Sequence, residues 1–112
     1  MVPEHEDDLL ANLVELRSGD ARRRFRQSIH EHWAGHCCYC GVKAQQLSID
    51  HIRAKAKGGD STRGNLCSCC VNCNRSKGTE DVWAWYQNQA FFCEHRKKAL
   101  LQWMGQRVLE AA

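Results

Sequence analysis

The sequence predicts a small α+β fold, and three observations support that prediction. The length of 112 residues is that of a single domain. The run LSIDHI at residues 47–52 alternates apolar and polar positions with the period of a β-strand, whereas the segments on both sides have helical spacing. Eight cysteines in so short a chain indicate that metal or disulfides support a modest apolar core.

Helices are expected before the strand. Residues 7–16 place leucines and a valine at helical spacing, and the sequence RSGD at 17–20 is expected to end that helix. Asp20 then caps a second helix that runs to about residue 33. The apolar face of this second helix would consist of Phe25, Ile29 and Trp33.

Helices are also expected after the strand. The segment KGGDSTRGN at 57–65 is expected to be a loop whose paired glycines permit a turn with positive φ. Thr79, followed by Glu80 and Asp81, predicts a helix start with Val82, Trp83 and Tyr86 on its apolar face. A last helix is expected from about Glu94. Its packed residues would be Leu100, Trp103, Met104 and Val108.

Composition excludes some compartments and partners. The N-terminal sequence MVPEHEDDLL is acidic and unlike a signal peptide. No apolar run approaches the roughly 20 residues that span a bilayer. We therefore expect a cytoplasmic protein with no membrane contact, in which paired cysteines bind metal more readily than they form disulfides.

The net charge of +3 is distributed unevenly along the chain. Residues 1–16 carry five acids and neither Lys nor Arg, whereas residues 17–77 carry twelve Lys or Arg against four acids, a net charge of +8. Residues 78–112 balance at four against four. The basic middle suggests a polyanionic partner, with nucleic acid as the leading candidate, although a solvated basic surface would have the same composition.

Two C-x-x-C pairs predict a metal centre. Cys37 pairs with Cys40, and Cys70 pairs with Cys73. Two such turns can supply four thiolates to one zinc ion, and a site closed by four sulfurs is structural rather than catalytic. Binding of this kind can supply about 10 kcal/mol or more of apparent folding free energy.

A different register of the second pair is possible, because Cys67 and Cys70 also have C-x-x-C spacing. We prefer Cys70 with Cys73 because Asn74 follows that pair as Gly41 follows the first. The remaining cysteines would then be packing residues, although a second metal site at Cys67 and Cys69 is an alternative. These remaining residues are Cys38, Cys67, Cys69 and Cys93.

The segment between and including the cysteine pairs resembles the zinc-containing HNH endonucleases. It reads C-x-x-C, Asp50-His51, Gly58-Gly59, Asn65-Leu66, and then C-x-x-C-N-x-x-K-G, over residues 37–78. The family's first histidine falls on His51 and its central asparagine on Asn65. Its final histidine is replaced by Asn74, as in many members, and its usual proline after D-H by Ala54.

The resemblance implies a ββα-metal core, in which a short antiparallel hairpin and a helix are braced by zinc. We expect a single domain over 1–112, with this core at about 34–80 and helical flanks at 5–33 and 80–110. Asn65 would tie the loop to the strand that carries His51. Catalytic roles would thus fall on His51, Asp50, Asn65 and Asn74.

These residue types suit metal-dependent hydrolysis of DNA phosphodiester bonds with low sequence specificity. His51 would accept the proton of the attacking water, while Asp50 and Asn74 would offer oxygen ligands to Mg²⁺ or Mn²⁺. Phosphate contacts are expected from Arg53, Lys55, Lys57, Arg75 and Lys77, with further candidates at Arg22, Arg23, Arg24 and Arg26.

Two other functions fit parts of the sequence. One is a non-catalytic zinc module that binds nucleic acid, and the other is a partner-binding zinc domain with tryptophan-rich C-terminal helices. Neither needs Asp50, His51, Asn65 and Asn74 in this order, and those residues therefore favour the nuclease. The sequence leaves open whether the substrate is double-stranded DNA, single-stranded DNA or RNA, and leaves the oligomeric state open as well.

Overall fold

The computed structural model describes the backbone of residues 11–111 and the side chains of residues 19–105. In chain order the elements are α1 (Ala11–His32), β1 (Ser48–His51), the 3-10 turns η2 (Lys55–Lys57) and η3 (Arg63–Asn65), β2 (Leu66–Cys69), α2 (Val71–Lys77), α3 (Val82–Tyr86) and α4 (Glu94–Ala111). Within the described part of the chain, no helix is both long and apolar enough to cross a membrane.

The centre of the fold is a two-stranded antiparallel sheet followed by a helix, which confirms the predicted ββα arrangement and the α+β class. The register places Ser48 opposite Cys69 and Asp50 opposite Cys67. The loop between the strands includes Gly58, whose φ of 89° confirms the expected left-handed turn.

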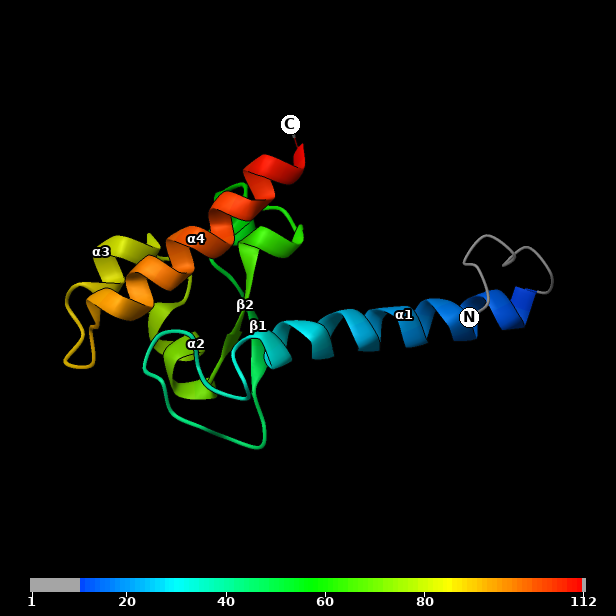
Figure 1. Cartoon of the computed structure of the whole chain (residues 1–112), viewed down its shortest axis with the longest axis horizontal. Coiled ribbons are helices and arrows are strands. Elements are labelled where there is room, and N and C mark those ends of the chain that lie inside the picture. Colours follow the sequence, from blue (N-terminus) through cyan, green and yellow to red (C-terminus); the bar gives the residue numbers. More distant parts are fainter. Residues whose placement is uncertain (1–10, 112) are drawn as a thin grey trace.

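Helix α1 projects from the body that the sheet, α2, α3 and α4 form (Figure 1). The helix is continuous, so the predicted break at 17–20 is wrong. A glycine within a helix costs only about 1 kcal/mol, and Asp20 pairs with Arg23 one turn later, Oδ1 to Nη1 at 2.6 Å, instead of capping a new helix. The expected start at residue 7 lies outside the described residues.

The projection of α1 also limits which of its apolar residues are buried. Ile29 is fully buried and Trp33 packs partly against the core, whereas Phe25 is 38% exposed. The expectation of one continuous apolar face from 25 to 33 is therefore wrong at Phe25. Among the described side chains of α1, those that pack in or against the core, Ile29 and Trp33, lie at or just after its C-terminal end.

The short helix α3 begins two residues later than predicted. Asp81, and not Thr79, caps it by accepting a hydrogen bond from the Ala84 amide at 3.0 Å. Its buried face is formed by Val82, Trp85 and Tyr86, and Trp83 is only partly buried. The predicted start of α4 at Glu94 is confirmed.

Helices α1 and α4 both contact strand β2 of the sheet. His30 of α1 contacts the buried Ser68 of β2, Nδ1 to Oγ at 2.8 Å. Trp103 of α4 donates from its indole nitrogen to the Leu66 carbonyl at 2.8 Å. Leu100 is buried and Met104 packs partly against the same core, as expected, while the side chain of residue 108 lies outside the described part. The hairpin is therefore anchored by side-chain hydrogen bonds to both α1 and α4.

Candidate active site and metal centre

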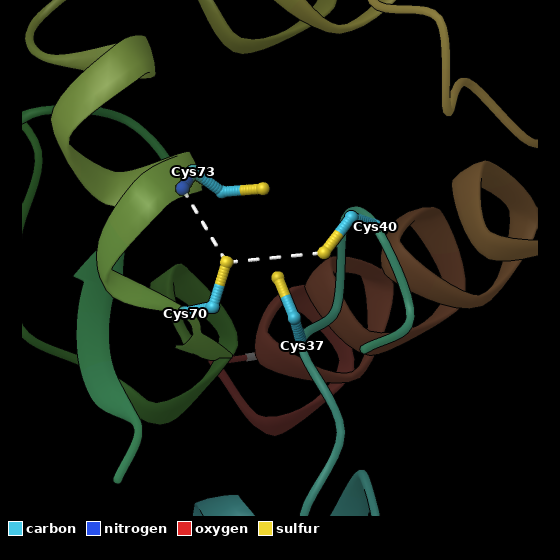
Figure 2. Close-up of side chains that lie close together, drawn as sticks. All are labelled: Cys37, Cys40, Cys70 and Cys73. Atoms are coloured by element: carbon cyan, nitrogen blue, oxygen red, sulfur yellow. Dashed lines mark hydrogen bonds between the residues drawn. The ribbon is translucent and has the colours of Figure 1, made fainter. Parts of the chain in front are cut away.

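Four cysteine sulfurs meet between the turn at 37–41 and the start of α2 (Figure 2). The sulfurs of Cys37, Cys40, Cys70 and Cys73 all lie within 4.8 Å of one another, and those of Cys40 and Cys70 are 3.8 Å apart. A tetrahedral zinc–thiolate site with bonds of about 2.3 Å requires sulfur–sulfur separations of about 3.8 Å. The donor set and its spacing therefore fit one zinc ion closed by four thiolates.

In each of the two turns, a backbone amide donates a hydrogen bond to a cysteine sulfur. The Tyr39 amide donates to the Cys37 sulfur, and the Cys73 amide donates to the Cys70 sulfur, each at 3.4 Å. Gly41 has a φ of 81°, and a Cβ there would lie 2.6 Å from Nη1 of Arg96. Glycine is therefore needed at the first turn, where Arg96 Nε donates to the Tyr39 carbonyl at 2.6 Å.

Crowding of the thiols separates their pKa values. Hydrogen bonds from neighbouring thiols, Cys38 foremost, lower the pKa of Cys37. The hydrogen bond with Cys37, together with burial, raises the pKa of Cys73, and burial raises the pKa of Cys40. Within the cluster the pKa of Cys37 is therefore lowered, whereas the pKa values of Cys40 and Cys73 are raised and disfavour their thiolates. A divalent cation that neutralises the thiolates would remove this penalty.

The other cysteines do not join the cluster. Cys38, Cys67 and Cys69 are buried in the hydrophobic core, and Cys93 is half-buried. The gathered set contains Cys73 and not Cys67, which agrees with the preferred register of Cys70 with Cys73. Among the residues that the structure describes, this is the sole cluster of at least three Cys, His, Asp or Glu ligand atoms with such spacing.

A second feature lies beside α2. Asp50 and His51, at the end of β1, line one cavity of about 240 Å³ with Asn74 of α2. Lys55 of the loop also lines it. The structure thus brings three of the four predicted catalytic residues together, next to an exposed cation.

The Asp50 carboxylate is held by two buried groups. Its Oδ2 accepts a hydrogen bond from the Tyr39 hydroxyl at 2.8 Å and lies 3.1 Å from the Lys77 ammonium. Lys77 also donates to the His51 carbonyl at 2.9 Å. Burial raises the pKa of Tyr39 well above its usual value, and its hydroxyl therefore stays protonated as a donor. These contacts fix the position of the carboxylate.

The other two predicted catalytic residues that line the cavity, His51 and Asn74, each contact a serine hydroxyl. His51 Nε2 lies 3.0 Å from the Ser61 hydroxyl of the loop. If that ring nitrogen carries the proton, Nδ1 is the basic nitrogen. Asn74 donates from Nδ2 to the Ser48 hydroxyl at 3.0 Å.

Asn65 has a different place from the other three. It is buried, and its side chain accepts from the Arg53 amide at 2.9 Å and donates to the carbonyls of Arg53 and Asp60 at 3.1 and 2.7 Å. The expected tie between the loop and the strand of His51 is confirmed. Its side-chain amide makes three hydrogen bonds to backbone groups, and Asn65 is therefore a structural clamp between the loop and the segment that follows β1.

The loop needs a glycine next to this clamp. A Cβ on Gly59 would lie 1.8 Å from the Arg53 carbonyl oxygen, whereas the Gly59 amide donates to the Ala54 carbonyl at 2.9 Å. Only glycine permits so close an approach of two backbone segments.

The predicted phosphate contacts separate into two groups. Arg53, Lys55, Lys57 and Arg75 are exposed on the same part of the molecule as the loop and α2, and Arg22, Arg23, Arg24 and Arg26 are exposed on α1. The assignment of Lys77 to phosphate is wrong, because its side chain is 0% exposed and its ammonium pairs with Asp50.

Sequence reasoning missed the partners that hold the site. Lys77 lies three residues after Asn74, one turn along the same helix, and Ser48 lies two residues before Asp50, on the same side of a strand. Both spacings could have indicated that Lys77 and Ser48 lie on the same side of their element as a predicted site residue. Tyr39 and Ser61 gave no such signal, because their contacts join segments that are separate in the chain.

Comparison with known proteins agrees with this geometry. Residues 37–80 match the family model described as HNH endonuclease. The chain is 38% identical over 55 residues to a CRISPR-associated endonuclease Cas9 of Corynebacterium diphtheriae and 39% identical over 54 residues to one of Actinomyces naeslundii. Each alignment covers 46% of this chain but 5% of the relative. No solved structure matches the chain significantly.

The matched segment contains both the thiol cluster and the cavity. The Asn74 position, where the family's final histidine is replaced, is occupied by a side chain that lines the cavity. Residues 37–80 of this protein are therefore similar to an HNH endonuclease domain, and they form a ββα core beside a cysteine cluster that could hold zinc.

Proposed function

We propose that this protein hydrolyses DNA phosphodiester bonds in a reaction that depends on Mg²⁺ or Mn²⁺. The observation that carries the proposal is the meeting of Asp50, His51 and Asn74 in one cavity of the HNH domain. A zinc module that only binds nucleic acid would not need a carboxylate, an imidazole and an amide around one cavity.

The residues of the cavity have separate tasks. Asp50 and Asn74 would hold a hard divalent cation through oxygen atoms, and that cation supplies stabilisation of charge on the phosphate and on the leaving oxygen. His51 accepts a proton from the attacking water. The bond from phosphorus to the 3′ oxygen breaks, the 3′ oxygen takes up a proton from solvent, and a 5′-phosphate remains.

The network around Asp50 supports this chemistry. Tyr39 and Lys77 both contact Oδ2 of Asp50. The Tyr39 hydroxyl and the Lys77 ammonium hold the carboxylate in one orientation. Asp50 is thus prepared for a cation before one binds.

The substrate class is proposed from charge. Lys55 lines the cavity, and Arg53, Lys57 and Arg75 are exposed on neighbouring segments. These side chains suit phosphates, which carry no base identity, and low sequence specificity is therefore expected.

A reducing, cytoplasmic compartment is proposed from the cysteines. All eight are without disulfide bonds, as is usual for proteins of such a compartment.

The test is cleavage of supercoiled plasmid by purified, zinc-loaded protein with and without Mg²⁺ or Mn²⁺. The parent should cut only with the added cation, and open circles should precede linear DNA because one turnover cuts one strand. His51→Ala should lower the rate about 10²–10⁴-fold, the usual contribution of a general base, while zinc content and DNA binding stay unchanged.

Either of two results would reverse the proposal. If the parent cuts neither DNA nor RNA with any divalent cation, or if His51→Ala cuts as fast as the parent, the nuclease assignment fails. Salt-sensitive binding of DNA by such an inactive protein would instead support a zinc module that binds nucleic acid.

A further inference from the structure

We propose that Ser48 is a positioning residue that fixes the orientation of the Asn74 side-chain amide, so that its oxygen and not its nitrogen is available to a divalent cation in the cavity. This inference rests on the proposed function of Asp50 and Asn74 as cation ligands. It adds Ser48 of β1, a residue to which the sequence pattern assigns no role.

The orientation follows from a chain of hydrogen bonds with one possible direction. The Ser48 hydroxyl donates to the Cys69 carbonyl at 3.1 Å. A carbonyl oxygen can only accept, and the hydroxyl has one proton, which this contact uses. Toward Asn74, at 3.0 Å, Ser48 can therefore only accept, and the atom of Asn74 that faces it must be the NH₂ group.

The alternative orientation of the amide has a clear cost. With the amide turned over, its oxygen would face the hydroxyl, which could donate to it only by giving up its hydrogen bond to the Cys69 carbonyl. The NH₂ group would then face the cation, and its protons repel positive charge while its nitrogen is not a ligand for hard cations. Ser48 selects the productive orientation before the cation arrives.

The position of Ser48 is itself well fixed. Ser48 pairs with Cys69 across the hairpin, and Cys69 directly precedes Cys70 of the thiol cluster. Asn74 directly follows Cys73 of the same cluster, and the backbone amide of Asn74 donates to the Cys70 carbonyl at 3.0 Å. The thiol cluster thus holds both ends of the contact, and the serine sets the remaining rotation of the amide.

The first test compares Ser48→Ala with the parent. Partners that orient metal ligands typically contribute 10–100-fold to metal affinity or activity, and we expect Ser48→Ala to weaken Mn²⁺ binding by about that factor. Binding is measured on the zinc-loaded protein by electron paramagnetic resonance of free Mn²⁺. The Mn²⁺ concentration for half-maximal cleavage should rise in parallel, with a smaller change in rate at saturating Mn²⁺.

A matched control lies next to it in the hairpin. Ser68 is also a hydroxyl of the sheet, but it contacts His30 of α1. Ser68→Ala should leave Mn²⁺ affinity within about twofold of the parent, as expected for independent sites. An equal loss in both variants would mean that any lost hydroxyl loosens the hairpin, and it would overturn the inference.

A second background separates positioning from general damage. Asn74→Asp places oxygen at both ends of the side chain, and no orientation then has to be selected. In that background Ser48→Ala should change Mn²⁺ affinity by no more than about twofold. If it costs as much as in the parent, Ser48 does not act through the orientation of Asn74.

The outcomes distinguish the two proposals. A parent that cleaves DNA, together with a Ser48→Ala variant of unchanged Mn²⁺ dependence, overturns the role of Ser48 and leaves the nuclease intact. A parent that neither binds Mn²⁺ nor cleaves removes the proposed function and, with it, the inference.

Discussion

The ammonium of Lys77 lies 3.1 Å from Oδ2 of Asp50, and both side chains are buried. One residue comes from the end of α2 and the other from β1, and the pair therefore joins the helix to the strand that carries the proposed cation ligand. A basic residue in a basic segment would ordinarily be assigned to phosphate. Here its burial makes it part of the protein interior.

Loss of Lys77 should therefore affect stability before it affects binding of DNA. Lys77→Met leaves a buried carboxylate without its cation, and such changes cost about 3–5 kcal/mol. Urea unfolding of the zinc-loaded protein measures the loss, and the exposed Lys57→Met should stay within about 0.5 kcal/mol of the parent. Adding Asp50→Asn should recover part of the loss in a double-mutant cycle. Wild-type stability in Lys77→Met would contradict the buried pair.

The thiol cluster predicts about one zinc per chain. Cys73→Ser should lose zinc and unfold at lower denaturant, because three thiolates no longer close the site. Cys67→Ser should retain zinc, since Cys67 lies in the core outside the cluster, and the half-buried Cys93→Ser should be mild. Elemental analysis with urea unfolding decides the result. Zinc retained in Cys73→Ser but lost in Cys67→Ser would reverse the register.

The Asn65 clamp should couple loop order to cleavage. Asn65→Ala leaves the Arg53 amide and the carbonyls of Arg53 and Asp60 without their side-chain partner. A buried unpaired group costs about 1–3 kcal/mol, and a misaimed catalytic group can cost about 10²-fold in rate. Both effects are expected at normal zinc content, with the exposed Asn72→Ala as control. Full activity in Asn65→Ala would show that the clamp does not position His51.

Binding of DNA should depend on salt through the exposed cations of the body. If Arg53, Lys55, Lys57 and Arg75 each meet a phosphate, the log–log slope is about −3.6, and each Lys57→Gln or Arg75→Gln change reduces it by about 0.9. Fluorescence anisotropy with a catalytically inactive His51→Ala protein measures the slope. Lys98→Gln, an exposed change on α4, should leave it unaltered. A steeper slope than four contacts allow would indicate that the arginines of α1 also bind DNA.

Acid should destabilise the protein through His30. Burial, and secondarily the charge of Arg26, lower the pKa of His30 below its ordinary value of 6.5. The unfolded chain then binds a proton more readily than the folded one. Stability is fully present above about pH 6.5 and falls as the pH drops through the folded pKa. His30→Gln should show a smaller loss of unfolding free energy between pH 7.5 and 5.5 at saturating zinc. An equal pH dependence in both proteins would exclude this residue as a cause.

The helical flanks show where local sequence patterns were insufficient. Arg17–Asp20 reads as a break, yet α1 continues through it, since one glycine without a proline costs less than the surrounding helix gains. Thr79 and Asp81 are both plausible caps, and only the path of the chain decides that Asp81 faces the Ala84 amide. Phe25 has the spacing of a core residue, but its side chain is 38% exposed.

The sequence by itself predicted the thiol ligands, because the spacing of each C-x-x-C pair brings two sulfurs together in one turn. The resemblance of its motifs to the HNH family predicted the ββα order and one site for Asp50, His51 and Asn74, which line the same cavity. Only the tertiary structure decided that Lys77 turns inward to Asp50, that Tyr39 donates to the same oxygen, and that Ser48 faces Asn74. Those contacts depend on which buried groups must satisfy one another, and that is settled when separate segments pack together and exclude water.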